Sequence, residues 1–233
     1  MHVFYTDSAA DKQLLLSPEE SKHALRVLRI QPGDIAEILN GKGQRLTARF
    51  EGAEMKQCFF TVLESEYTPP RPLHLTMAIA PTKSIDRFEW ALEKATEIGV
   101  ERIIPIISRH SERKVVKTER SQKILIAAMK QSRTAWLPEI TEPVPYPIFL
   151  KDLSDQRASR YIAHCFKNDL SHFHNESAAE KMEILIGPEG DFDEHEVQQA
   201  VDLGWKEISL GQTRLRTETA AIVAVHLVAL KLL

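Results

Sequence analysis

Hydrophobic residues in the second part of the chain fall into short continuous runs, separated by longer segments with helical spacing. The runs lie at residues 73–80, 103–107, 161–165, 182–186 and 208–210. Runs of this length are typical of strands buried on both faces of a parallel sheet. Between the first two, Ile85, Phe88, Leu92 and Ala95 repeat on one helical face, and Gly99 is a helix stop. The alternation of strands and helices predicts an α/β fold with a mostly parallel sheet.

The first 67 residues carry shorter patterns, which predict a small β-rich domain. Strand candidates lie at residues 3–5, 14–16, 35–39, 46–50 and 58–63. Asn40-Gly41 is a hairpin signal between two of them. A helix is expected to begin at Pro18, with Ser17 as its N-cap and Glu20 completing a capping box. Several strands at such short spacing favour a small barrel.

Residues 68–72 separate the two patterns. This segment reads Thr-Pro-Pro-Arg-Pro and places three prolines in four positions. Such a segment favours a stiff, extended connector. The sequence therefore predicts a β-barrel domain at residues 1–67, a linker at 68–72 and an α/β domain at 73–233.

Two turns near the end of the chain each follow a predicted strand and precede a predicted helix. The first, at residues 187–191, reads Gly-Pro-Glu-Gly-Asp, and the second, at 211–219, reads Gly-Gln-Thr-Arg-Leu-Arg-Thr-Glu-Thr. Open α/β sheets bind ligands at the carboxyl ends of their strands, and glycine lets a backbone approach a ligand closely. We therefore expect both turns to face one ligand site, although Gly-Pro-Glu-Gly alone is also an ordinary tight turn. Asp193 and Glu196 predict a capping box at the helix that follows the first turn.

Residues 220–230 are apolar apart from His226. Eleven residues are too few to span a bilayer as a helix. This segment is expected to be a helix that is buried or that faces a partner subunit, and no membrane association is predicted.

Composition and charge describe an ordinary globular protein. The net charge is −3, and Cys58 and Cys165 have neither metal-ligand spacing nor a disulfide framework. The first 20 residues lack the pattern of a signal peptide. We therefore expect a cytoplasmic protein. His172 and His174 are the one close pair of histidines; a loop is the simpler interpretation, and no metal site is predicted.

One segment is strongly basic within this acidic chain. Between residues 109 and 133 the sequence has eight Lys or Arg residues against two Glu, a local charge of +6. The cations are Arg109, Arg113, Lys114, Lys117, Arg120, Lys123, Lys130 and Arg133. A run of this kind favours a phosphate-binding surface, and a solvated helix face is the alternative.

The two turns carry a resemblance to a known family. The segments IGPEGDFDEHE (186–196) and LGQTRLRTETA (210–220) resemble the signature of the RsmE family of SPOUT-class methyltransferases. Lys83, KATEIGV (94–100) and the QSR and LPEI segments within 131–140 are similar to that family too, as is the segment 23–29 with the following Pro-Gly-Asp. The resemblance implies a cytoplasmic homodimer that uses S-adenosyl-L-methionine to methylate N3 of a uridine, uridine 1498 in the conventional numbering, in 16S rRNA of the small ribosomal subunit. It also implies a deep trefoil knot in the α/β domain and a PUA-like, RNA-binding β-barrel before it.

The resemblance and the local chemistry together nominate site residues. The expected cofactor-binding residues are Ile186, Gly187, Glu189, Gly190, Leu210, Gly211, Leu215, Arg216 and Thr217. The expected RNA-binding residues are Arg26, Arg29, Lys83, Arg109, Arg113, Lys114 and Arg133.

Two residues of the second turn are the expected catalytic pair. Uridine N3 carries a proton and becomes a good nucleophile only when that proton leaves. A cation can stabilise the resulting anion and a carboxylate can accept the proton. We expect Arg216 to be the cation and Glu218 to be a base or to orient Arg216. Because Glu218 lies in the first turn of a helix, favourable interaction with the helix dipole is an alternative reason for its presence.

Two positions depart from the family pattern. Asp191 stands where a second glycine is usual, and Thr213-Arg214 replaces the usual Arg-Ile. The aspartate could reshape the turn or cap it. Arg214 could take over a role that residue 213 has lost.

Other functions find less support in the sequence. No G-x-G-x-x-G motif follows an early strand and no P-loop motif is present, which disfavours Rossmann-type enzymes and phosphoryl transfer. Two alternatives stay open: a SPOUT methyltransferase that acts on transfer RNA or another nucleotide, and a non-catalytic RNA-binding ribosome-assembly factor.

Overall fold

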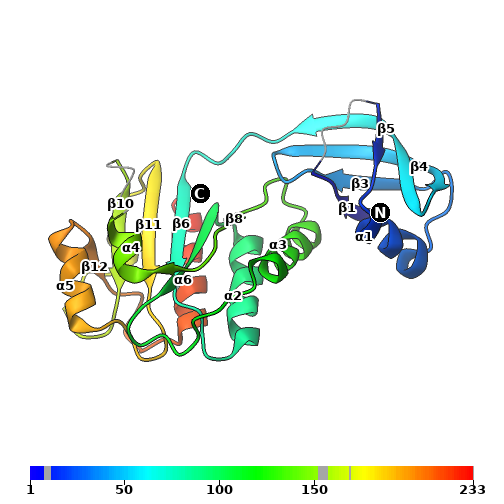
Figure 1. Ribbon diagram of the computed structural model, residues 1–233. Helices are drawn as coiled ribbons and strands as arrows, with labels where there is room; N and C mark the ends of the chain where they lie inside the picture. Colours follow the sequence, from blue (N-terminus) through cyan, green and yellow to red (C-terminus); the bar gives the residue numbers. More distant parts are fainter. Residues whose placement is uncertain (8–11, 152–156, 168, 233) are drawn as a thin grey trace. The chain divides into compact units, whose positions relative to one another are not determined.

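The computed structural model describes residues 1–7, 12–151, 157–167 and 169–232, and the chain divides into two compact units. Unit 1 comprises Met1–Pro70 together with Ile126–Leu137. Unit 2 comprises Arg71–Leu125 together with Pro138–Leu233. Figure 1 colours the chain from the blue and cyan strands of unit 1 to the red last helix of unit 2. The segment Ile126–Leu137, from the middle of the chain, thus belongs to the same unit as the N-terminal strands.

Unit 1 is built on a five-stranded sheet with the order β1-β3-β4-β5-β2. Its strands are β1 (His2–Tyr5), β2 (Gln13–Leu15), β3 (Ile35–Leu39), β4 (Gln44–Glu54) and β5 (Gln57–Tyr67). Strand β1 runs parallel to β3, and the other neighbours are antiparallel. All five strands were predicted from the sequence, because each carries its own apolar alternation between turn signals.

The core of unit 1 is formed by the inward side chains of this sheet. Leu46, Ala48 and Phe50 of β4 are buried, as their alternation predicts. The ring of Phe60 lies 5.2 Å from that of Phe50 and 5.8 Å from that of Phe4, which joins three strands in one aromatic cluster.

Helix α1 (Pro18–His23) begins where the sequence predicts and continues into a π-helical turn, η1 (Ala24–Leu28). The Ser17 hydroxyl accepts a hydrogen bond from the Glu20 amide at 3.2 Å. The prediction of a full capping box is wrong, because the Glu20 carboxylate accepts the Tyr5 amide at 3.2 Å and pairs with Lys130. A strand amide and an ammonium group from a distant segment compete successfully for this carboxylate.

Unit 2 contains a parallel seven-stranded sheet with the order β12-β10-β11-β6-β7-β8, and β9 also pairs with β7. The strands are β6 (His74–Ile79), β7 (Arg102–Ile107), β8 (Glu139–Ile140), β9 (Val144–Pro145), β10 (Ser159–Ala163), β11 (Lys181–Ile186) and β12 (Lys206–Ile208). The predicted parallel sheet is confirmed. Strand β10 lies between β11 and β12, so the strands that precede the two turns are not direct neighbours.

The last strand was predicted two residues too late, at 208–210 instead of Lys206–Ile208. Its pairing with β10 ends at Ile208, opposite Ala163. Ser209 no longer pairs with β10; its backbone instead forms a parallel bridge with His172, donating to the Ser171 carbonyl oxygen and accepting the Phe173 amide, both at 2.9 Å. The pairing with β10 therefore ends where the backbone turns to another segment, and the Ser209 hydroxyl accepts the Gly211 amide at 3.3 Å within the turn.

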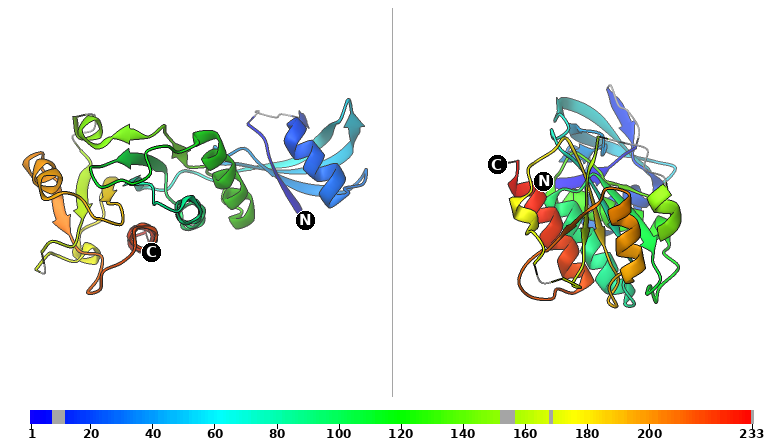
Figure 2. Two further views of the ribbon diagram at one scale, coloured as in Figure 1. Left: turned by 60° about the horizontal axis from the view of Figure 1, so that its bottom comes forward. Right: turned by 90° about the vertical axis from the view of Figure 1, so that its left-hand side faces the viewer.

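Helices cover both faces of the sheet of unit 2. The helices after residue 84 are α2 (Ile85–Ile98), α3 (Thr118–Ser132), α4 (Tyr146–Lys151), α5 (Glu194–Asp202) and α6 (Thr217–Leu230), with a 3₁₀ turn, η2 (Phe173–Asn175). Helices α2 and α6 pack together on one face, and α4 and α5 pack on the other, as Figure 2 shows. No helix among the described residues is both long enough and apolar enough to cross a membrane.

Helix α6 is apolar on more than its packed face. Ala221, Ala224, Val225 and Val228 are buried. On the other side Ile222, Val223 and Leu227 are half-buried, and Leu230 is 47% exposed. The helix is thus buried on one face and presents aliphatic side chains on the other.

Candidate active site

A cavity of about 280 Å³ lies at the carboxyl ends of β10, β11 and β12. It is lined by three segments: residues 163–165 after β10, residues 186–189 with Asp191 after β11, and residues 209–211 and 213–217 with Ala220 after β12. The two turns singled out in the sequence thus contribute to one cavity. Eight of the nine expected cofactor-binding residues line it: Ile186, Gly187, Glu189, Leu210, Gly211, Leu215, Arg216 and Thr217.

The turn after β11 needs its first glycine. A Cβ atom on Gly187 would stand 3.1 Å from the Phe192 ring and 3.2 Å from the Phe192 backbone nitrogen. Gly190 lies outside the cavity lining, and a Cβ there would meet His110 at 3.2 Å. The expectation that Gly190 contacts the cofactor is therefore not supported by its position, since it faces a neighbouring loop.

Asp191 explains how the chain tolerates the loss of the usual glycine. Its φ of +65° lies in the left-handed region, which aspartate tolerates better than most residues. One carboxylate oxygen accepts the Phe192 amide at 2.8 Å, and the other accepts the Cys165 amide at 2.9 Å. The aspartate therefore keeps the turn and joins it to the segment after β10.

Two further carboxylates connect neighbouring loops to this turn. Glu189 accepts the Lys83 amide at 2.9 Å, which ties the loop after β6 to the turn. Glu196 forms the predicted capping box with Asp193, and its other oxygen accepts the Arg109 amide at 2.9 Å. Since Glu196 is only 8% exposed, these bonds are shielded from water.

The turn after β12 supplies the cationic rim of the cavity. Arg214 and Arg216 line it and are exposed, and Arg216 is also the N-cap residue of α6. No described atom stands within 4 Å of the place where a Cβ of Gly211 would be, so the wall is open at that point. Two guanidinium groups and the positive end of a helix dipole make this rim favourable for an anion.

Glu218 takes a different direction from Arg216. It is not among the residues that line the cavity, it is 7% exposed, and one of its oxygens lies 3.8 Å from Nε of Arg87 on α2. Its other oxygen has no hydrogen-bond partner among the described residues. The expected catalytic pair is therefore not brought together around the cavity.

His164 and Cys165 line the cavity but were not predicted as site residues. Nδ1 of His164 accepts the Phe166 amide at 3.2 Å, so Nε2 carries the proton and donates to Glu207 at 3.0 Å. Burial raises the pKa of the Cys165 thiol, and the nearby Asp191 carboxylate adds to this rise. The available signal was a His-Cys pair directly after an apolar strand, at the strand end where ligands bind.

A pH dependence of stability follows from the Glu207 contacts. Lys167, and after it His164, hold the pKa of the Glu207 carboxyl below its ordinary value. Because the folded pKa is lower than the unfolded one, this contribution is present above about pH 4.3 and is lost as the pH falls through the folded value. In melting curves measured between neutral pH and about pH 3, Glu207→Gln should lose less stability than the wild type. Glu180→Gln, at an exposed position, is the control; equal losses in all three proteins would contradict this assignment.

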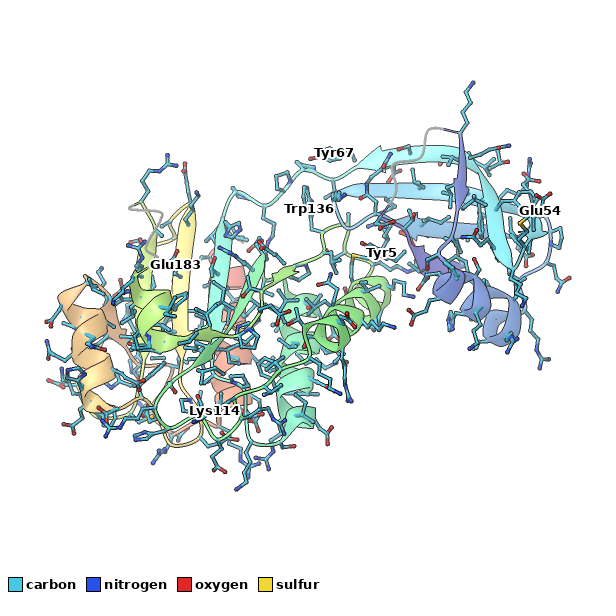
Figure 3. All side chains as sticks on the ribbon, in the orientation of Figure 1. Tyr5, Glu54, Tyr67, Lys114, Trp136 and Glu183 are labelled. Atoms are coloured by element: carbon cyan, nitrogen blue, oxygen red, sulfur yellow. The ribbon has the colours of Figure 1, made fainter. Side chains whose placement is uncertain are left out.

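The expected RNA-binding residues occupy both units. In unit 1, Arg26 and Arg29 are exposed, and Arg133 lies 3.7 Å from Glu37. In unit 2, Lys83 pairs with Glu112 at 2.8 Å and Arg109 with Asp193 at 3.3 Å. Arg113 donates to the carbonyl oxygens of Thr82 at 3.1 Å and Lys83 at 2.7 Å. Lys114 is exposed and lies in the loop region where β6 and β11 end (Figure 3).

The positive charge of the segment 109–133 is therefore partly neutralised by acidic residues from other parts of the chain. Four of its cations have carboxylate partners from elsewhere: Arg109 with Asp193, Arg120 with Glu89, Lys130 with Glu20 and Arg133 with Glu37. The segment is also divided between the units at Ile126. A single continuous phosphate surface does not follow from it.

Comparison with known proteins gives the class to which this fold and cavity belong. Residues 69–229 match the family of RNA methyltransferase domains, and residues 16–63 match the family of RNA methyltransferase PUA domains. The two matched regions contain the parallel sheet with its cavity and most of the β-rich unit. The position of the cavity agrees with this match, because open α/β sheets bind their ligands at the carboxyl ends of the strands. Together they define an RNA methyltransferase.

Individual relatives narrow the class. The ribosomal RNA small subunit methyltransferase E of Aquifex aeolicus is 30% identical over 97% of this chain and 98% of its own length. A probable rRNA-methyltransferase structure from Porphyromonas gingivalis is 38% identical, with a TM-score of 0.90 over 99% of this chain and 98% of that one. The ribosomal RNA small subunit methyltransferase E of Neisseria gonorrhoeae, solved bound to S-adenosyl methionine, is 28% identical, with a TM-score of 0.86 over 97% and 95%. This chain belongs to the ribosomal RNA small subunit methyltransferase E family, and the predicted family and fold class are confirmed.

Proposed function

We propose that this protein transfers the methyl group of S-adenosyl-L-methionine to N3 of a uridine, uridine 1498, in 16S rRNA of the small ribosomal subunit. One observation carries the proposal: two turns that lie apart in the sequence line one cavity, with Arg216 at its rim. The family supports the RNA substrate, and the relative solved with S-adenosyl methionine supports the cofactor. A ribosomal substrate is consistent with a cytoplasmic location.

The residues present fit a cofactor of this kind. The cavity volume of about 280 Å³ is close to the lower end of the roughly 300–1,000 Å³ found for small-molecule sites. Gly211 keeps a side chain out of one wall and Gly187 lets its turn pack closely against Phe192, so backbone amides and carbonyls at Ile186, Leu210 and Leu215 would hold the adenosyl group. When bound, the cofactor supplies an electrophilic methyl group on a sulfonium.

The chain contributes alignment and charge rather than covalent chemistry. Methyl transfer needs the nucleophile, the methyl carbon and the leaving sulfur in line, which a rigid set of turns can impose. The uridine N3 must also lose its proton. Arg216 would stabilise the negative charge that develops on the uracil ring, aided by the N-terminus of α6.

Glu218 is best assigned a positioning role. Its contact with Arg87 joins the first turn of α6 to α2, which fixes the backbone directly after Arg216. A general base must reach the proton that it accepts, directly or through one water molecule. Because Glu218 lies outside the cavity lining, orientation of the Arg216 turn is the more economical interpretation.

We also propose a homodimer and a trefoil knot, both implied by the family resemblance. The half-exposed aliphatic side of α6 supports a contact with a second copy, since such a surface gains from burial. Sedimentation of the purified protein tests the dimer: a single species of monomer mass at micromolar concentration would exclude it.

The function is tested in cells and in solution. Mass spectrometry of 16S rRNA from a strain that lacks this gene should show loss of 3-methyluridine, and the wild-type gene should restore it. Isothermal titration should show binding of S-adenosyl-L-methionine to the purified protein. Retained 3-methyluridine in the deletion strain would reject the proposed substrate, and absence of cofactor binding would reject the enzyme.

Lys114 provides a test of RNA contact near the cavity. Arg113 is unsuitable because its guanidinium holds the loop at Thr82 and Lys83. Lys114→Glu should weaken binding to the small-subunit particle and lower the slope of log affinity against log salt by about 1, leaving cofactor affinity unchanged. Lys151→Glu, an exposed lysine at the end of α4, is the control. An unchanged salt slope in Lys114→Glu would remove Lys114 from the RNA surface.

A further inference from the structure

A second hollow lies directly beside the cavity. It is lined by His110, Phe166, Gly190, Phe192, Asp193, Glu194 and His195, and is called the aromatic niche below. The cavity and the niche share a wall, because Cys165 lines the cavity while Phe166 lines the niche, and Gly190 in the niche lies between Glu189 and Asp191 of the cavity. Because these lining residues are consecutive in the chain, the same backbone segments border both hollows.

The niche presents flat side chains to solvent in a fixed arrangement. Phe166 is 44% exposed, although its amide donates to His164 and its ring lies 5.5 Å from the His164 ring. Nδ1 of His110 contacts the Asp191 carbonyl oxygen at 3.1 Å, which holds that imidazole at the edge of the niche. His195 is exposed on the first turn of α5. An exposed aromatic ring that is held in place, with imidazole edges around it, suits a partner with a flat apolar face.

The surroundings favour a nucleobase over a protein partner. One exposed phenyl ring among polar groups is far smaller than the roughly 800 Å² per partner of a stable protein interface. A base, in contrast, stacks on a single ring and bonds through its edges to imidazole and carboxylate groups.

Cations for the attached phosphates stand next to the niche in the chain. The side chains of Arg109 and Lys167 are 70% and 55% exposed, whereas the carboxylates of their partners Asp193 and Glu207 are 24% and 18% exposed. A guanidinium and an ammonium group each have more N–H donors than these pairs use, so both cations can donate to a phosphate without leaving their carboxylates.

We propose that the aromatic niche holds the unpaired base next to the target nucleotide in the substrate RNA, an inference that rests on the proposed function. A target base that reaches the cofactor at the mouth of the cavity must leave its stack, which costs a few kcal/mol. Stacking of the neighbouring base on Phe166 replaces part of the lost stacking. Because the cavity and the niche share a wall, one RNA strand can place adjacent bases at the mouth of the cavity and in the niche.

Kinetics on small-subunit particles test this inference. Base stacking on an aromatic ring contributes about 1–3 kcal/mol, so Phe166→Ala should raise KM for the particle by about 5- to 150-fold. Affinity for S-adenosyl-L-methionine, measured by titration, should stay unchanged. Phe166→Trp should restore most of the loss, and Leu203→Ala, which removes an exposed apolar side chain at the end of α5, should have no effect. His195→Ala, at an exposed position, should show a smaller loss in the same direction.

Several results would overturn the inference. They are an unchanged KM in Phe166→Ala, a Phe166→Trp variant as defective as Phe166→Ala, a parallel loss of cofactor affinity, or conversion of a dimer to a monomer. If Phe166→Ala lowers the melting temperature, His195→Ala becomes the deciding variant. A KM for the particle equal to that of the wild type in His195→Ala would then reject the niche.

Filter binding of the particle without cofactor separates this inference from the proposed function. A wild type that forms no methylated product refutes the function, whereas equal particle affinity of wild type and Phe166→Ala refutes the niche.

Discussion

Arg216→Ala is expected to lower kcat by about 100- to 1,000-fold while S-adenosyl-L-methionine still binds. The expected factor follows from the effect of removing one charge-stabilising donor from a preorganised site. Arg216 lines the cavity and is exposed at its rim, so the fold does not depend on its side chain. Single-turnover methylation of small-subunit particles gives the rate, and isothermal titration gives the cofactor affinity.

Arg214→Ala is the matched control for this result. Arg214 lies two residues away on the same turn and also lines the cavity. If any positive charge near the cavity serves equally well, both variants lose the same fraction of kcat. That result would reject a specific role for Arg216. If only cofactor affinity falls in Arg216→Ala, the residue binds the cofactor and does not stabilise the reacting base.

Glu196→Ala is expected to lower the free energy of unfolding by about 2–4 kcal/mol, since it removes both a helix cap and a buried charged acceptor. The carboxylate accepts the amides of Asp193 and Arg109, and its removal leaves two amide groups without their partner. The loop after β7 should also loosen, so cofactor affinity should fall along with stability. Urea denaturation followed by circular dichroism measures the first effect, and isothermal titration measures the second.

Glu194→Ala tests whether the effect is specific to Glu196. Both residues lie in the first turn of α5, where an acidic group interacts favourably with the helix dipole, but Glu194 is exposed. Its substitution should cost less than about 1 kcal/mol. Equal destabilisation in the two variants would show that Glu196 stabilises the protein only through its interaction with the helix dipole.

The sequence allowed the cavity to be predicted because its signals are local. Each turn follows an apolar strand run, and the carboxyl ends of parallel strands meet at one edge of a sheet. These two local signals are sufficient to expect Gly187 and Arg216 at one site. The small β unit was predictable for a similar reason, since its strands alternate independently of what they pair with.

The parts that the sequence did not predict depend on partners distant in the chain. Strand order is not local, so nothing indicated that β10 lies between β11 and β12 and brings His164 to the cavity. The Glu189 contact with the Lys83 amide joins segments 106 residues apart, and no pattern in either segment indicates it. The acidic partners of the cations between residues 109 and 133 could not be predicted for the same reason, because they come from other segments.

Membership of residues 126–137 in unit 1 was also not predicted. The contacts of this segment there include Trp136, whose indole donates to the Thr68 carbonyl oxygen at 3.0 Å, and Lys130, which pairs with Glu20. Each of these contacts uses a single polar side-chain atom, one on α3 and one in the segment that follows it. No sequence pattern distinguishes either atom. The proline-rich segment marked a change of pattern along the chain, whereas unit membership is decided by contacts in space.

The placement of β10 between β11 and β12 has a consequence for biosynthesis. The cavity requires the segments that follow the strands on both sides of β10, and the last of them reaches Ala220. A ribosome-bound nascent chain that has exposed β6 to β11 can already pair six of the seven strands, yet it has no complete wall for a ligand. Affinity for the methyl donor should therefore arise only after α6 has left the exit tunnel, which keeps unfinished chains from acting on the RNA of the particle that makes them.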